Sequence, residues 1–133
     1  MINVNDLMCG NWVYNNMLRC AYKLLNVMHN TRVEEYDPIP VTADMLKRIG
    51  FEEYEDLPLE GKFYRYWDKN HKYKLDVRDF WTNSQRKWYV HIDNGVCETL
   101  GSGEFDYVHE LQNLVRIITG FSLPITKEMI DGL

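Results

Sequence analysis

The sequence contains little that marks a secreted, disulfide-rich or membrane-spanning protein. Its three cysteines, Cys9, Cys20 and Cys97, are odd in number and widely spaced, which favours reduced, mostly buried thiols over a disulfide framework or a zinc site. No apolar run approaches the roughly 20 residues of a membrane span. The N-terminus has neither the basic start nor the apolar core of a signal peptide. We therefore expect a cytoplasmic protein that makes no contact with a membrane.

Signatures of catalysis are also missing. The sequence has no Walker loop, no nucleophile elbow and no serine-triad spacing. His109-Glu110 begins like a zinc-protease motif, but Asn113 stands where the second histidine is needed, and asparagine is a poor zinc ligand. The sequence therefore predicts no catalytic residue, no bound metal and no cofactor.

What is present is typical of one ordinary globular domain. The 133 residues are 45% apolar and 26% charged, so the chain has enough apolar side chains to offset the conformational entropy lost on folding. It contains neither an internal repeat nor a low-complexity linker. We therefore expect residues 1–133 to form a single domain.

Charge is distributed in blocks along the chain. The formal net charge is −5, yet residues 34–60 carry nine acidic against two basic residues, and residues 61–91 carry eight basic against three acidic ones. A net acidic domain with one basic block is a poor binder of long nucleic acids, although the block can hold a few phosphates locally. Alternatively, the basic block complements the acidic ones within the fold or in a homo-oligomer.

The N-terminal region predicts two short strands. Apolar residues at 12–14 and 21–27 flank a turn signal at Asn15-Asn16. A helix over 17–28 fits the apolar spacing nearly as well, so strand and helix both remain open for this stretch.

A short helix is predicted over 41–50, after the extended segment Pro38-Ile39-Pro40. Thr42 is suited to cap its N-terminus and Gly50 to end it. The acidic stretch 52–62 is predicted to be a loop.

An antiparallel meander is predicted next. Asp93-Asn94-Gly95 is a hairpin signal because the central residues of a type I′ turn need positive φ. Gly101-Ser102-Gly103 is expected to break the last strand as a simple turn rather than a phosphate loop, since the nearby Glu104 and Asp106 would repel phosphate. The strands are expected at 63–67, 72–81, 86–92 and 96–100.

A second helix is predicted over 107–119, where apolar residues recur at helical spacing, and it is followed by an extended tail that ends at Pro124. This helix should cover one face of the meander. The predicted fold class is α+β, an antiparallel β-sheet of about five or more strands with a C-terminal helix packed on one face and a short helix at its edge.

Alternation along the meander separates two faces of the sheet. The inner face, which should be buried, is expected to contain Tyr73, Leu75, Val77, Trp81, Trp88, Val90 and Ile92. The outer face, which should meet solvent, supplies the candidate ligand-binding residues Arg65, Lys74, Arg78, Lys87, Tyr89 and His91.

This outer face suggests a site for a small phosphate-bearing ligand. Flat rings can stack on a base while Arg and Lys hold phosphates, and a second subunit could complete a pocket that one sheet face leaves shallow. Two alternatives remain open: the exposed aromatics serve structure or an oligomer interface, and Asp76 neutralises Lys74 and Arg78 internally.

A second polar cluster is expected on the C-terminal helix. His109, Gln112, Asn113 and Arg116 are spaced by three and four residues, so they share one helical stripe. A polar network at the helix edge is the first interpretation, and a ligand contact is the second.

Three stretches carry a resemblance to a known family. They are Asp6-Leu7 with Gly10-Asn11-Trp12-Val13, then 38–46 with Gly50-Phe51, and last 107–114 with Thr119-Gly120. The chain resembles a family of small uncharacterised proteins encoded by phages, prophages and mobile elements of Bacteroidota. The resemblance implies no activity and no catalytic residues; it implies a small accessory protein acting in the cytoplasm of a host cell.

Together these observations give three hypotheses of function. The first is a non-enzymatic accessory binding protein, acting in counter-defence, that sequesters a small nucleotide-type immune signal on the outer face. The second is an inhibitor that occludes a host protein, for which the acidic segment 34–60 is the better surface. The third is a small phosphoester hydrolase that uses a histidine. The expected partner is thus a small anionic ligand or a host protein.

Overall fold

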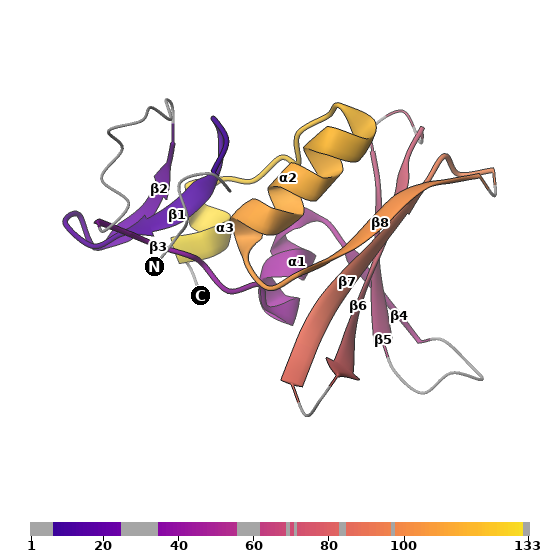
Figure 1. Ribbon diagram of the computed structural model, residues 1–133, viewed down its shortest axis with the longest axis horizontal. Helices are drawn as coiled ribbons and strands as arrows, with labels where there is room; N and C mark the ends of the chain where they lie inside the picture. Colours follow the sequence, from indigo (N-terminus) through magenta and orange to yellow (C-terminus); the bar gives the residue numbers. More distant parts are fainter. Residues whose placement is uncertain are drawn as a thin grey trace.

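The protein consists of two antiparallel sheets with helices between them (Figure 1). The structure is a computed structural model, and it describes residues 7–24, 35–55, 62–68, 70, 72–82, 85–96 and 98–131. The predicted α+β class is confirmed, with a five-stranded sheet, a C-terminal helix on one of its faces and a short helix beside it. None of the helices in these ranges is long and apolar enough to cross a membrane.

The smaller sheet is built from the N-terminal part of the chain. Its strands are β1 (Trp12–Asn15), β2 (Cys20–Lys23) and β3 (Tyr36–Asp37), in the order β2-β1-β3. The side chain of Asn15 accepts hydrogen bonds from the backbone of Met17 and Leu18, which fixes the tight turn between β1 and β2. The open choice at the start of 17–28 is therefore resolved as a turn and a strand, while residues 25–28 lie outside the described ranges.

The thiols near this sheet differ from expectation. Cys9 is exposed and Cys20 is half-buried, so the prediction of mostly buried thiols is wrong for Cys9. Cys97 lies outside the described residues. The exposed position follows from the turn at Cys9-Gly10, which leads into β1 at the surface of the small sheet.

Helix α1 (Ala43–Ile49) forms where it was predicted. The Thr42 side chain accepts a hydrogen bond from the backbone N–H of Met45, and Gly50, at φ 124°, closes the helix with an N–H bond to Leu46 O. The buried residues Met45, Leu46 and Ile49 attach the helix to the core.

The acidic loop predicted over 52–62 is wrong at both ends, because Glu52–Glu55 form strand β4, which pairs with β5, and Lys62 already belongs to β5. Lys47 lies 2.9 Å and Lys62 2.8 Å from the carboxylate of Glu53. Tyr54 stacks on Phe63 across the strand pair, with ring centroids 5.3 Å apart. Partners on α1 and on the neighbouring strand β5 therefore compensate for the low strand preference of glutamate. Residues 56–61 are outside the described ranges.

The larger sheet is the predicted meander, extended by β4 to the order β4-β5-β6-β7-β8. The turn at Asp93-Asn94-Gly95 differs from the predicted type I′ turn, because Gly95 has a positive φ but Asn94 does not. Instead, Asn94 N–H bonds to Glu98 O and the connection runs to Thr99, which pairs with Asp93. The bounds are Lys62–Trp67 for β5, Lys74–Thr82 for β6, Gln85–Asp93 for β7 and Thr99–Phe105 for β8.

Strand β8 passes through the three residues that were predicted to break it. A Cβ on Gly101 would lie 2.8 Å from Cδ1 of Ile118, and one on Gly103 would lie 2.7 Å from Cδ2 of Leu114. Leu114 and Ile118 both belong to α2 (Val108–Thr119). These glycines therefore permit close packing of helix on strand rather than ending the strand.

Helix α2 covers the inner face of the large sheet (Figure 1). Its N-terminus is closed by Glu110, whose carboxylate accepts hydrogen bonds from the N–H groups of Asp106 and Tyr107. The expected inner-face residues Leu75, Val77, Trp88, Val90 and Ile92 are buried in the core with Phe105, Leu111 and Val115. Tyr73 is half-buried, and the side chain of Trp81 lies outside the described part.

The predicted extended tail is incomplete, because a third helix, α3 (Lys127–Asp131), follows it. This short helix contacts β2 and α1, and its Ile130 is 7% exposed. Tertiary burial stabilises a helix that is too short to persist by itself.

The first prediction concerns the helix–strand contact. Gly101→Ala should destabilise the protein by about 1–3 kcal/mol, because the added methyl overlaps the β-branched and therefore stiff side chain of Ile118. Denaturant unfolding measures this loss. Ser102→Ala, on the exposed neighbouring residue, should be nearly neutral, and Ile118→Ala should relieve part of the Gly101→Ala penalty. Additive losses in the double variant would contradict the proposed overlap.

The second prediction concerns pH. Hydrogen bonds from Lys62 and Lys47 lower the pKa of Glu53 to about 2, from an ordinary value near 4.5. A depressed folded-state pKa means that the stabilisation is complete above about pH 5 and is lost as pH falls towards 2. The difference in unfolding free energy between wild type and Glu53→Gln should follow this course. In a Lys47→Gln/Lys62→Gln background, the same substitution should show no such pH dependence.

Candidate binding face of the five-stranded sheet

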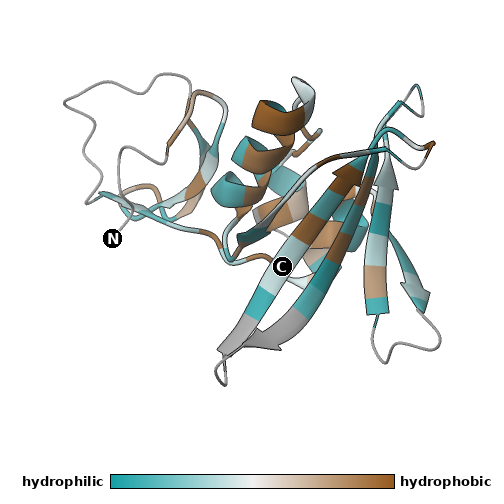
Figure 2. Cartoon of the chain, turned by 45° about the vertical axis from the view of Figure 1, so that its right-hand side comes forward, coloured by the Kyte–Doolittle hydropathy of each residue, from teal (hydrophilic) through white to brown (hydrophobic). Residues whose placement is uncertain are grey.

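All six residues predicted to bind a ligand lie on the outer face of the large sheet, the face turned away from α1 and α2 (Figure 1). They alternate with residues of the buried inner face, and Figure 2 shows the corresponding bands of hydrophilic and hydrophobic residues along the strands. These six residues are Arg65, Lys74, Arg78, Lys87, Tyr89 and His91. The structure thus brings them to one surface, but not into one cluster.

Strand register arranges all of these residues except Lys87 in three cross-strand rows on the outer face. The aromatic row contains Tyr54, Phe63, Arg78, Tyr89 and Glu104. The charged row contains Glu52, Arg65, Asp76, His91 and Ser102. The end row contains Trp67, Lys74, Asp93 and Thr99. Residues opposite one another on neighbouring strands are close enough for their side chains to interact.

The aromatic row centres on Phe63, which is only 8% exposed although it lies on the outer face. The ring of Tyr54 stacks on it, and the guanidinium carbons of Arg65 and Arg78 lie 5.1 and 4.9 Å from its centroid. Such cation–π contacts hold a guanidinium flat against a ring. Arg78 is in turn paired in register with Tyr89, so a cation lies between two rings along this row.

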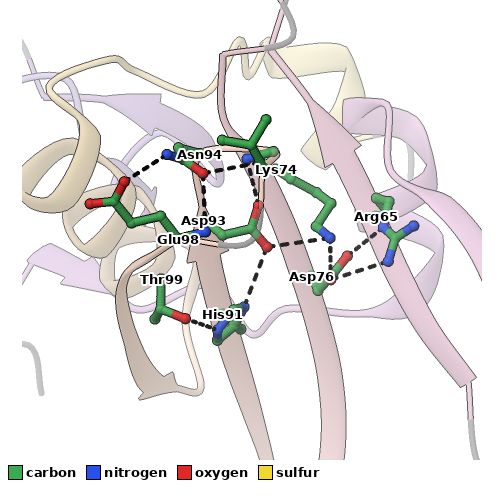
Figure 3. Close-up of polar contacts among 10 residues, drawn as sticks. Arg65, Lys74, Asp76, His91, Asp93, Asn94, Glu98 and Thr99 are labelled. Atoms are coloured by element: carbon green, nitrogen blue, oxygen red, sulfur yellow. Dashed lines mark hydrogen bonds and ion pairs between the residues drawn. The ribbon is translucent and has the colours of Figure 1, made fainter.

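The charged row contains the strongest pairing on this face (Figure 3). Arg65 donates two hydrogen bonds to Asp76, Nε to Oδ1 at 2.7 Å and Nη2 to Oδ2 at 3.3 Å. The bond to Asp76 raises the pKa of Arg65. A bidentate, partly buried pair of this kind fixes both side chains.

Lys74 joins the charged row to the end row. Its Nζ lies 3.3 Å from Asp93 and 4.0 Å from Asp76. His91 lies between the same rows, with Nδ1 3.9 Å from Asp93 and Nε2 3.2 Å from the Thr99 hydroxyl (Figure 3). The ammonium of Lys74 is therefore already shared by two carboxylates.

Lys87 lies at the other end of β7 and pairs with Asp106 at 2.8 Å, a hydrogen bond that raises the pKa of Lys87. The four cations predicted as phosphate ligands are thus engaged: three by carboxylates, and Arg78 by the Phe63 ring. Three of these cations, Arg65, Lys74 and Arg78, belong to the rows, which also contain four acidic residues, Glu52, Asp76, Asp93 and Glu104. The basic block of the sequence therefore does not produce a strongly positive surface.

The same register assembles three potential metal ligands. One ligand atom from each of Asp76, His91 and Asp93 lies within 4.8 Å of the others. Sequence spacing gave no sign of this set, since β-pairing brings it together. However, Lys74 and Arg65 already neutralise both carboxylates, so a divalent ion would have to displace the ammonium of Lys74.

The predicted polar cluster on α2 lies apart from the outer face and is directed towards the small sheet. Gln112 accepts a hydrogen bond from Trp12 N and donates one to Gly10 O, while Asn113 accepts one from the side chain of Asn11. Arg116 donates to the carbonyl of Cys9 at 2.8 Å. His109 is separate: it is 4% exposed and stacks on Tyr107. Three of the four side chains thus hold the N-terminal strands.

Sequence reasoning missed several residues of the outer face. Tyr54 was assigned to a loop, and Phe63 and Asp93 were not considered as outer-face residues. Phe63 was detectable, because it lies two residues from Arg65 along β5 and therefore shares the same face of the sheet. Comparison of the chain with protein-family models, curated proteins and solved structures gave no match. The site's chemistry therefore has to be inferred from this geometry.

A double-mutant cycle tests the pairing in the charged row. For Arg65→Met and Asp76→Ala we expect a coupling of about 1 kcal/mol, at the upper end for surface pairs, because both side chains are partly buried and the contact is bidentate. Denaturant unfolding of the four proteins gives this value. A coupling of zero would contradict a preformed pair.

Proposed function

We propose that this protein is a non-enzymatic binding protein that holds a nucleotide-type ligand on the outer face of its large sheet. The aromatic row is the observation that supports it. Tyr54 is 39% exposed, Tyr89 is half-buried, and Arg78 lies between them in register. Nucleobases stack on aromatic rings and on guanidinium planes, whatever their sequence, so such a row is a suitable platform for a base.

The charge pairing determines what kind of binding this would be. Because Arg65, Lys74 and Lys87 are engaged with carboxylates, a phosphate would have to compete for them. Stacking would then supply most of the affinity, and the phosphates would contribute less than in a basic groove. The binding should accordingly depend weakly on salt concentration, unlike binding that releases many counterions.

The resemblance to small phage and mobile-element proteins gives this proposal a biological setting. An accessory protein of that kind that binds nucleotides without converting them would lower the free concentration of a nucleotide immune signal in the host cytoplasm. Sequestration requires only that the protein binds the ligand tightly and is abundant, so no catalytic group is needed.

A protein partner is the second candidate, and one observation favours it. Strand β4 lies at the edge of the same sheet, all four of its residues are exposed, and three of them are glutamates. Glu52 and Tyr54 extend the outer face to this edge. A basic surface of a host protein would meet complementary charge there, as the hypothesis of an acidic docking segment requires.

Calorimetry with adenosine, ATP, 3′,5′-cyclic AMP and cyclic di-AMP tests the nucleotide proposal. At least one should bind, and adenosine and ATP should differ by less than about tenfold if stacking dominates. Tyr89→Ala should weaken binding by about 1–3 kcal/mol, the usual contribution of one stacked ring, whereas Tyr89→Phe should retain it.

Tyr14→Ala provides the matched control, because Tyr14 is 38% exposed but belongs to the small sheet. Its nucleotide affinity should equal that of wild type. Absence of heat with all four compounds would overturn the nucleotide proposal in favour of the protein partner. An equal loss in Tyr14→Ala and Tyr89→Ala would show that the outer face is not the site.

A further inference from the structure

A small cavity lies where the N-terminal strands meet α2, on a different part of the molecule from the outer face. Its volume is about 100 Å³. The turn at Cys9-Gly10, β1, β2, α2 and the segment after α2 all contribute to its wall, through residues that include Cys9, Trp12, Lys23, Gln112, Arg116 and Ser122. Since a water molecule takes about 30 Å³ of the liquid, the space suits roughly three waters or one small polyatomic group.

The wall of this cavity is held by hydrogen bonds between distant parts of the chain. Gln112 binds both the N–H of Trp12 and the carbonyl of Gly10, and Asn113 binds the side chain of Asn11, which is 3% exposed. Arg116 reaches the carbonyl of Cys9. The polar groups around the cavity are therefore positioned before any ligand arrives, which lowers the entropic cost of binding.

The charged residues that line the cavity are all basic. Lys23 and Arg116 both line the cavity, and none of the lining residues is an aspartate or glutamate. Within the described ranges, no ion pair joins either cation to a carboxylate. This differs from the outer face, where Arg65, Lys74 and Lys87 are each paired.

The donor chemistry matches an oxyanion. The guanidinium of Arg116 has five N–H donors, of which the bond to Cys9 O uses one, and guanidinium geometry suits carboxylate and phosphate oxygens. Lys23 adds a mobile ammonium, and Ser122 a hydroxyl. We propose that this cavity is a binding site for the phosphate or carboxylate group of a small molecule, held by Arg116 and Lys23.

Melting temperatures measured in sodium phosphate and in sodium acetate, each compared with sodium chloride at equal ionic strength, test this site. At ten times the dissociation constant, the bound anion should raise the melting temperature by about 5 °C above the chloride control. A shift with phosphate alone assigns the site to phosphate groups, and one with acetate alone assigns it to carboxylates. No shift with either anion would overturn the proposal.

Single-residue variants test whether the anion that raises the melting temperature binds in the cavity. Lys23→Gln and Arg116→Lys should weaken anion binding at least fivefold, and Arg116→Lys keeps a cation at the position in case Arg116→Gln does not fold. Lys72→Gln is the matched control, since Lys72 is exposed, lies outside this cavity and loses the same charge. If Lys72→Gln lowers the affinity as much as Lys23→Gln, the effect is general electrostatics and the proposal fails.

An NMR titration places the anion directly. Phosphate or acetate should shift the resonances of Trp12 and Gln112, two residues that line the cavity, and leave the amides of β6 unchanged. Shifts confined to the outer face would assign the anion to the other surface and overturn the cavity site. Because the two sites use different residues, nucleotide binding on the outer face can fail while this one holds.

Discussion

The close packing of α2 on β8 is the contact on which the rest of the structure depends. It is possible because Gly101 and Gly103 leave space for Ile118 and Leu114. The helix is thereby placed on the inner face of the large sheet, and the described helices leave the outer face open (Figure 1). The opposite side of the same helix carries Gln112, Asn113 and Arg116 to the N-terminal strands. One helix thus supports both candidate sites.

The two sites use charge in opposite ways. On the outer face, Arg65, Lys74 and Lys87 each lie beside an acidic side chain and Arg78 lies against the Phe63 ring, so that the side chains are ordered and the net charge is small. Binding there has to come from rings and shape. The small cavity is lined by two cations, Lys23 and Arg116, and none of its lining residues is acidic. A compact anion gains most from such a wall, because a charge-assisted hydrogen bond is about twice as strong as a neutral one.

Much of the architecture was predictable from local pattern. Alternation of apolar and polar residues assigned Leu75, Val77 and Val90 to the core, and helical spacing located α2. Other features depend on contacts that a local pattern does not contain. The strand character of β4 comes from lysines on α1 and β5, and the glycines of β8 are explained only by the helix above them. The pairing of Arg65 with Asp76 depends in the same way on strand register.

The hydrogen bonds between α2 and the N-terminal strands also have a consequence for the order of folding. Gln112 bonds to Trp12 and Gly10 across sequence separations of 100 and 102 residues, and Arg116 bonds to Cys9 across 107. Closing loops of this length costs entropy that must be met before the contacts form. Residues 9–12 therefore cannot dock on α2 until their hydrogen-bonding partners, about 100 residues further along the chain, have been synthesised.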